Sequence, residues 1–216
     1  MSKASRIHCL IRFDSRERVE DFCYKGKLYM NTLKFFNELE AKDILRGDKS
    51  EGLAESHPSE KCHFFIKEDT RWLEINGLTG QVRFGDSRDK DINIFCLYAV
   101  TEKNEDSLVD EGALRLGDYA AIILEGDEFL TRVKKAFEER QWAYCHDLVD
   151  YIDKNTYSGP MGPFRKYSDR EFQSEFRIAS KTNQQKAIDN FYIGDIRDIT
   201  RLCDSKTIRN LLKIVK

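Results

Sequence analysis

The sequence is poor in the residues and patterns that mark disorder, repeats and secretion. Its 216 residues include only 3 Pro, 12 Gly and 4 His, while apolar residues make up 40% and charged residues 34%. This composition excludes a collagen-like or disordered chain and predicts a soluble globular protein. No apolar run approaches the ~18 residues that cross a bilayer, and the N-terminal segment lacks the pattern of a secretory signal. We therefore expect a cytoplasmic protein without a membrane partner.

Cysteine and histidine are scattered rather than clustered. The six cysteines contain no CxxC pair, so we expect reduced thiols. Three of the four histidines adjoin a cysteine, and adjacent residues on a strand point to opposite faces, which disfavours a shared metal ion. P-loop, dinucleotide-binding, HExxH and GxSxG motifs are absent from the sequence. We expect no metal cofactor, and the common nucleotidases and hydrolases are excluded.

The formal net charge of −2 hides an uneven distribution of charge along the chain. Residues 101–128 hold nine acids and two bases, whereas residues 181–216 hold eight bases and four acids. A protein near neutrality can therefore still present a basic surface. The stretch 157–170 adds cations of its own. If both basic segments lie beside a cleft, this distribution favours a polyanionic substrate.

Hydrophobic patterning predicts a chain that mixes strands and helices. The expected strands are 6–13, 25–31, 61–68, 71–77, 81–86, 92–100, 119–124, 146–153, 171–180 and 190–195. Four helices are expected: one after Asp14, one over 32–42, one that begins near Asp127 and one over 204–216. The strands within 61–86 suggest an antiparallel meander, and the apolar run 92–100 a central strand covered on both faces. Polar residues 45–60 and the Pro/Gly-rich stretch 157–170 are expected loops.

The helix starts and the absence of a linker complete the predicted architecture. Asp14 with Glu17 three residues later forms a capping box, and Asp127 can cap an amphipathic helix that buries Phe129 and Val133. Since no flexible linker divides the chain, we expect a single domain over residues 1–216. The predicted class is α+β, with two packed, mostly antiparallel sheets and peripheral helices.

The segment FQSEFR is the most informative local pattern in the sequence. Strand alternation places Gln173, Glu175 and Arg177 on one face and the two phenylalanines on the other. A polar strand face is typical of an edge strand exposed to solvent. It also fits a carboxylate fixed on a rigid strand after a loop, which is a suitable place for a catalytic acid.

The order of these polar residues resembles the ADP-ribosyltransferase superfamily. Its members carry a His or Arg on a first strand, a Tyr on a second and a Gln-x-Glu or x-x-Glu on a late strand. The corresponding residues here are Arg12 or His8, Tyr29 and Glu175. The stretches 26–52 and 164–178 also resemble bacterial proteins found in phage-defence and toxin–antitoxin loci. A Ser-Thr-Ser strand is not evident, so Tyr29 fits a His, Tyr, Glu-like arrangement better.

The resemblance implies an ADP-ribosyltransferase-like fold and an NAD-dependent toxin that modifies an intracellular target. It implies that Glu175, Tyr29 and Gln173 are catalytic, with Glu175 stabilising the positive charge that develops on the ribose. The implied NAD-binding residues are Arg12, His8, Tyr29, Phe35 and Phe36, with Arg12 on the pyrophosphate. Taken alone, Arg12 is also typical of an ordinary surface arginine, and Tyr29, Phe35 and Phe36 are also typical of core aromatic residues.

The loop before Glu175 is where members of this superfamily recognise targets. Cations alternate there with aromatic residues, which suits single-stranded nucleic acid. The expected target-binding residues are Arg165, Lys166, Tyr167 and Arg170. RNA is the favoured acceptor, a protein acceptor is also open, and an antitoxin partner is expected. An ordinary surface loop fits the same residues.

Further alternatives concern the activity and a second loop. A non-catalytic nucleotide- or nucleic-acid-binding module on the same fold and an NAD glycohydrolase both remain open. The second loop contains Arg46, Asp48 and Glu51. We expect their side chains to be solvated.

Overall fold

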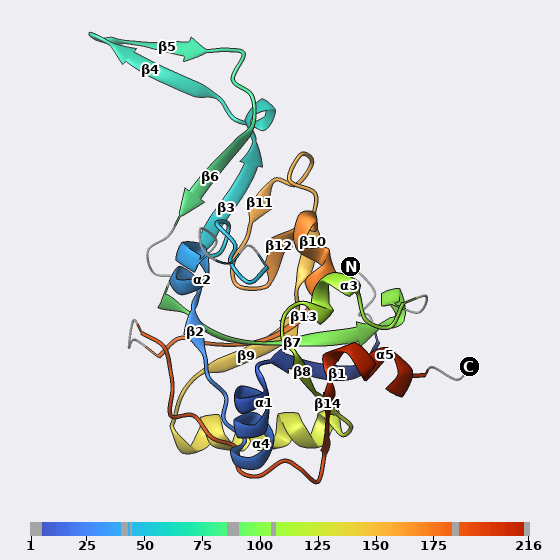
Figure 1. Cartoon of the computed structure of the whole chain (residues 1–216). Coiled ribbons are helices and arrows are strands. Elements are labelled where there is room, and N and C mark those ends of the chain that lie inside the picture. Colours follow the sequence, from blue (N-terminus) through green and yellow to red (C-terminus); the bar gives the residue numbers. More distant parts are fainter. Residues whose placement is uncertain are drawn as a thin grey trace.

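An antiparallel sheet forms the centre of the computed structural model, which describes residues 6–39, 43, 45–85, 91–104, 107–182 and 186–213 (Figure 1). Its strand order is β14-β8-β1-β7-β13-β9, and the short β2 also pairs with β7. These strands are β1 (Ile7–Asp14), β2 (Asn31–Thr32), β7 (Asn93–Thr101), β8 (Tyr119–Ile123), β9 (Tyr144–Leu148), β13 (Glu175–Ser180) and β14 (Thr200–Asp204). β7 is buried along almost its whole length between β1 and β13, which confirms the predicted central strand.

Helices α1 (Arg16–Lys25) and α4 (Gly126–Glu139) cover one face of this sheet (Figure 1). Phe22 of α1 and Phe129 of α4 pack edge to face, with ring centroids 6.0 Å apart, in the apolar cluster that joins both helices to the sheet. Among the helices of the described residues, none is long and apolar enough to cross a membrane.

The caps of both helices differ from the prediction. Ser15 caps α1, because its hydroxyl accepts from the backbone N–H of Arg18 at 3.5 Å, while Asp14 accepts from the N–H of Ser15. α4 begins at Gly126, so Asp127 lies inside its first turn. Gly26 ends α1 with a φ of 61°, and a Cβ there would lie 2.1 Å from the Gly194 carbonyl oxygen, so only glycine fits.

The opposite face of the sheet carries short elements instead of a second large sheet. α3 (Glu111–Leu114) and α5 (Ile208–Leu211) cover one part of it, beside η3 (Glu102–Asn104) and η5 (Ser205–Thr207). α2 (Leu33–Leu39) packs on the rest of this face. On the same side of the sheet lie η1 (Ser59–Lys61), η4 (Ser168–Gln173) and the strands β3 (Leu53–Pro58), β6 (Gln81–Gly85), β10 (Asp150–Ile152), β11 (Gly159–Pro160) and β12 (Arg165–Tyr167), of which β3 and β6 extend away from it (Figure 1). The single-domain α+β prediction with antiparallel sheets is therefore confirmed. The expected second sheet is replaced by β11-β3-β6 and the parallel pair β10-β12.

Several predicted boundaries are wrong in this second layer. The expected loop 45–60 contains β3, and the expected loop 157–170 contains β11 and β12. The expected strand 146–153 divides into β9 and β10, which belong to different sheets. The sequence pattern does not predict these strands, because the stretches that contain them are polar and include Pro. Each strand is also only two to six residues long and pairs with a distant segment.

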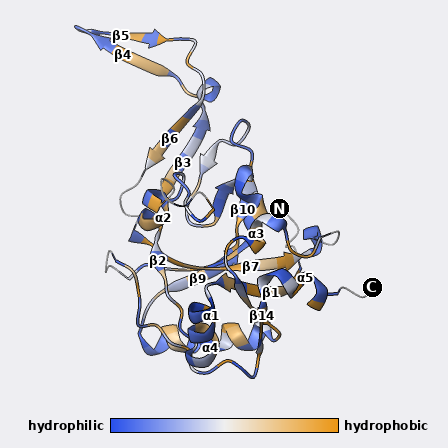
Figure 2. Ribbon diagram, in the orientation of Figure 1, coloured by the Kyte–Doolittle hydropathy of each residue, from blue (hydrophilic) through white to orange (hydrophobic). Residues whose placement is uncertain are grey.

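A β-hairpin projects from the body (Figure 1). It consists of β4 (Phe64–Glu68) and β5 (Arg71–Ile75), which pair with each other, whereas β6 pairs with β3 and so ends the predicted meander. Figure 2 shows hydrophobic residues on the hairpin, outside the body. The side chains of Phe65, Ile66, Trp72 and Leu73 are all exposed.

The C-terminal segment also differs from the prediction. β14 was not expected and pairs with β8 at the sheet edge, while the predicted strand 190–195 forms a single isolated bridge, between Tyr192 and Lys27. The predicted strand 25–31 likewise reduces to β2 and its neighbouring bridges. The terminal helix is limited to α5, and residues 214–216 lie outside the described residues.

Candidate functional site

The main sheet opens between β1 and β7. Pairing between these strands ends at Ile11 and Tyr98, after which β1 continues along β8 and β7 continues along β13. Arg12 spans the start of the opening, because its Nη1 donates to the carbonyl oxygen of Cys96 at 2.9 Å. A cavity of about 310 Å³ lies at this opening, bordered by β1, β7 and β13 and by α2.

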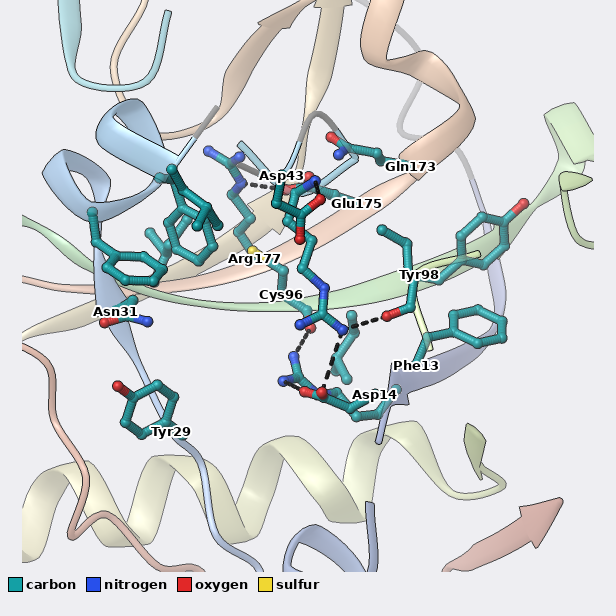
Figure 3. A pocket seen from close by; sticks show the side chains of 18 of the residues that line it. Phe13, Asp14, Tyr29, Asn31, Asp43, Cys96, Tyr98, Gln173, Glu175 and Arg177 are labelled. Atoms are coloured by element: carbon teal, nitrogen blue, oxygen red, sulfur yellow. Dashed lines mark hydrogen bonds and ion pairs between the residues drawn. The ribbon is translucent and has the colours of Figure 1, made fainter. Parts of the chain in front are cut away.

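Most of the predicted site residues come together in this cavity. Those that line it are Arg12, Tyr29, Phe35, Phe36, Lys166, Gln173 and Glu175. Figure 3 shows Tyr29 on one side of the cavity, apart from Glu175 on the other. His8 does not line the cavity, because it lies exposed at the start of β1.

A buried ion network holds Glu175 at the cavity wall; its members are Asp48, Glu51, Lys166, Glu175 and Arg177. Lys166 Nζ lies 2.8 Å from Glu175 Oε1 and 3.2 Å from Glu51 Oε1. Arg177 Nε donates to Glu175 Oε2 at 2.6 Å, and Arg177 Nη1 donates to Glu51 Oε2 at 3.1 Å. Each carboxylate oxygen of Glu175 therefore faces a different cation.

These contacts fix the protonation states of the network. Burial opposes the ionisation of Glu175, but Arg177 and Lys166 outweigh it and lower its pKa to about 2. Burial also opposes the charge on Lys166, yet Glu175 and Glu51 raise its pKa. Burial and the nearby Glu175 raise the pKa of Cys96 to about 12, so its thiol is not a nucleophile at neutral pH.

Gln173 lines the cavity, but it does not belong to the strand of Glu175 and Arg177 as alternation predicted. The residue ends η4, Ser174 follows with a φ of 37°, and β13 begins only at Glu175. Gln173 accepts from Lys166 Nζ at 2.6 Å and donates through Nε2 to the Leu45 carbonyl oxygen at 2.7 Å. It thus connects the ion network to the loop that follows α2.

A second group of charges, the arginine cluster, consists of Arg12, Asp14, Arg18 and Arg46. The Asp14 carboxylate lies 2.6 Å from Arg12 Nη2, 3.3 Å from Arg46 Nη2 and 3.7 Å from Arg18 Nη1. Burial opposes the ionisation of Asp14, but Arg12 and Arg46 outweigh it and lower its pKa. Three guanidinium groups thus share one carboxylate, so positive charge is in surplus within this cluster.

Aromatic side chains form a further part of the cavity wall. Phe35 is 40% exposed, and its ring meets that of Phe36 edge to face with centroids 5.4 Å apart. The guanidinium of Arg18 lies 5.7 Å from the centre of the Tyr29 ring. These rings can contact a planar ligand group beside the arginine cluster.

The structure corrects the predicted target-binding loop. Lys166 and Tyr167 are both buried: Lys166 enters the ion network, and the Tyr167 hydroxyl bonds to that of Ser56 at 2.6 Å. Contact with a target on the surface is therefore not available to these two side chains. Arg165 is half-buried and donates to the Pro160 carbonyl oxygen, and Arg170 is half-buried on η4.

Of the two segments expected to bring positive charge to the cavity, the loop before Glu175 contributes Lys166, and residues 181–216 contribute nothing within their described part. Further positive charge comes from Arg12, Arg18 and Arg46, of which Arg18 showed no distinguishing sequence signal. Asp48 and Glu51, expected to be solvated, are buried. The spacing that they share with the resembling bacterial proteins was the only signal for them.

Two further observations bear on the site. Within the described residues, no group of three or more His, Cys, Asp or Glu side chains is placed to hold a metal ion. Comparison of the chain with protein-family models, curated proteins and solved structures finds no match.

Proposed function

We propose that this protein is an NAD-dependent ADP-ribosyltransferase that acts as a toxin on an intracellular acceptor, with RNA the first acceptor to test. The observation that carries this proposal is that Arg12, Tyr29 and Glu175, far apart in the sequence, line one cavity where the main sheet opens. The lining suits the parts of NAD. It supplies cations for a diphosphate, aromatic rings for a planar group and a carboxylate for a ribose that gains positive charge.

Glu175 is the residue that acts on the reacting ribose in this proposal. When the bond between ribose C1′ and the nicotinamide nitrogen breaks, the electron pair leaves with nicotinamide and positive charge develops on the ribose. Because its pKa is held at about 2, Glu175 stays anionic and stabilises this charge without transferring a proton. The acceptor then forms a bond to C1′ and releases its proton to solvent.

The neighbours of Glu175 act as positioning residues. Lys166 and Arg177 each hold one oxygen of the carboxylate, and Gln173 holds Lys166 through its side-chain oxygen. The implied catalytic role of Gln173 is thus better described as fixing the orientation of Glu175.

The projecting hairpin supports RNA as the acceptor. Trp72 is 65% exposed and lies opposite Lys67 in the register of β4 and β5. Phe65 is also exposed and, two residues from Lys67, lies on the same face. Exposed rings beside a cation suit the bases and phosphates of a single strand. A protein acceptor is the other outcome, and a toxin of this kind needs an antitoxin.

A specific observation favours a second candidate, a non-catalytic nucleotide-binding module. Both carboxylate oxygens of Glu175 already accept hydrogen bonds from cations, which weakens the field that the carboxylate exerts on a ribose. Such a module would bind NAD and leave its glycosidic bond intact.

The test incubates the purified protein with NAD labelled in its adenylate phosphate and with RNA, DNA or cell lysate. We expect label on RNA together with released nicotinamide, and a loss of about 100-fold or more in Glu175→Gln. Glu175→Gln removes the carboxylate between two buried cations and can therefore also lower stability. Tyr29→Ala, at a half-buried side chain outside the ion network, is measured in parallel as a second test of the cavity. Arg16→Gln is the matched control, since Arg16 pairs with Glu20 outside the cavity.

The possible results separate the candidates. Nicotinamide release without a labelled acceptor identifies an NAD glycohydrolase. NAD binding without nicotinamide release identifies the binding module. Unchanged labelling in both Glu175→Gln and Tyr29→Ala would exclude this cavity as the active site.

A further inference from the structure

We propose that the arginine cluster is a diphosphate-binding subsite assembled by Asp14, in which Arg18 and Arg46 contact the ligand together with Arg12. The inference rests on the proposed function only in taking the ligand to be an ADP-ribose compound. It assigns roles to two arginines and a carboxylate that the sequence pattern leaves without one.

The cluster is built from three separate parts of the chain. Arg12 comes from the end of β1, Arg18 from the first turns of α1 and Arg46 from the loop after α2. All three line the cavity, and each forms an ion pair with Asp14. Like charges from distant segments repel one another, so their convergence at a cavity wall needs a compensating charge there.

Asp14 supplies part of that compensation from a fixed position. Its side chain is only 3% exposed, and one of its oxygens also accepts from the Ser15 N–H at 2.9 Å. Its backbone is covered by Gly117, where a Cβ would lie 2.4 Å from the Asp14 nitrogen, so the close approach requires glycine. Within the cluster, one carboxylate balances one guanidinium and two guanidinium charges remain. Asp43 also lines the cavity, and its carboxylate accepts from the backbone N–H groups of Leu45 and Arg46.

Three converging guanidinium groups suit a diphosphate diester, which carries two negative charges at neutral pH. Arg18 and Arg46 have side chains that are 57% and 33% exposed, so a ligand in the cavity can reach them. Planar guanidinium groups bind phosphate oxygens through paired N–H donors, and groups from several directions suit two linked phosphates. The Tyr29 ring beside Arg18 gives a surface for a group attached to the diphosphate.

Calorimetric titration with ADP-ribose, AMP, adenosine and inorganic pyrophosphate tests this subsite. We expect ADP-ribose to bind, pyrophosphate to compete with it, AMP to bind more weakly and adenosine not to bind measurably. Arg18→Gln and Arg46→Gln should each weaken ADP-ribose binding roughly tenfold, because each removes a charge-assisted hydrogen bond. Arg16→Gln, at a neighbouring exposed arginine outside the cavity, should leave the affinity unchanged.

The positioning role of Asp14 has its own readout. Asp14→Asn should weaken ADP-ribose binding and also reduce the dependence of affinity on salt, since arginines that are no longer gathered neutralise fewer ligand charges. A substitution that only lowered stability would shift the unfolding temperature and leave the salt dependence of the remaining folded protein unchanged.

Several results would overturn the inference: no binding of ADP-ribose, equal affinity for AMP and ADP-ribose, or full affinity in the Arg18→Gln/Arg46→Gln double variant. These results are distinct from failure of the proposed function. Arginine-dependent ADP-ribose binding without nicotinamide release would support the subsite and exclude the transferase. Nicotinamide release that is unchanged in the double variant would do the reverse.

Discussion

The buried ion network and the arginine cluster line the same cavity but differ in their balance of charge and in their exposure to solvent. In the network, Lys166 and Arg177 are enclosed by carboxylates, and the Arg177 side chain is only 1% exposed. In the cluster, the guanidinium groups outnumber the carboxylate, and Arg18 and Arg46 reach solvent. The network therefore fixes a charge within the fold, whereas the cluster keeps charge available for a ligand.

This difference separates stability from binding. A cation enclosed in a buried network is hard to remove, because its loss leaves carboxylates unpaired in a poorly solvated site. An exposed cation contributes little to stability, since water and salt screen it. Substitutions in the two groups should thus have different principal effects although both groups line one cavity.

Arg177→Met should have the largest effect on stability. It keeps most of the side-chain volume but leaves Glu51 and Glu175 with Lys166 as the cation nearest to both. We expect the free energy of unfolding to fall by about 3 to 5 kcal/mol, as measured by urea denaturation. A loss below about 1 kcal/mol, the level of an exposed ion pair, would contradict the comparison.

Lowering the pH should have the next largest effect on stability, because it protonates the carboxylate of Glu175. Glu175 has a folded-state pKa of about 2 against an ordinary value of 4.5. A lowered folded-state pKa gives stability that is fully present above pH 4.5 and is lost as the pH falls toward 2. We expect the free energy of unfolding to fall by an amount on the order of 2 kcal/mol over this window. Urea denaturation at a series of pH values measures this loss. Glu175→Gln should flatten the profile, and an unchanged profile would show that Glu175 is not ion-paired.

Arg46→Gln should have the smallest effect on stability. Its side chain is 33% exposed, and its ion pair with Asp14 is 3.3 Å long. We expect the free energy of unfolding to change by about 1 kcal/mol or less, measured by the same denaturation, although ADP-ribose binding falls. A loss as large as that of Arg177→Met would mean that both groups are structural.

The parts of the fold that follow local periodicity were predictable from the sequence. The apolar run 92–100 gave the central strand, and Val19 and Phe22 in α1 and Phe129 in α4 gave the helix faces that pack on it. Strands such as β3 and β12 were missed because their pairing partners are distant, and no local pattern encodes such pairing.

The candidate site was predictable only in part. The resemblance named Arg12, Tyr29 and Glu175, which do line one cavity, but it also named His8, which lies outside. Lys166 was expected on the surface because its loop is polar, yet it is buried by carboxylates from another segment. Arg18 escaped notice because an exposed arginine on a helix is ordinary, and only the fold brings it to Asp14.

The central claim, that the opening between β1 and β7 is an NAD-cleaving site, is tested most directly by the release of nicotinamide from NAD. The wild-type protein and Arg16→Gln should release nicotinamide at the same rate. Glu175→Gln should release it at least about 100-fold more slowly, and Tyr29→Ala should also release it more slowly than the wild type. No release by the folded wild-type protein, or equal release by all four proteins, would contradict the account.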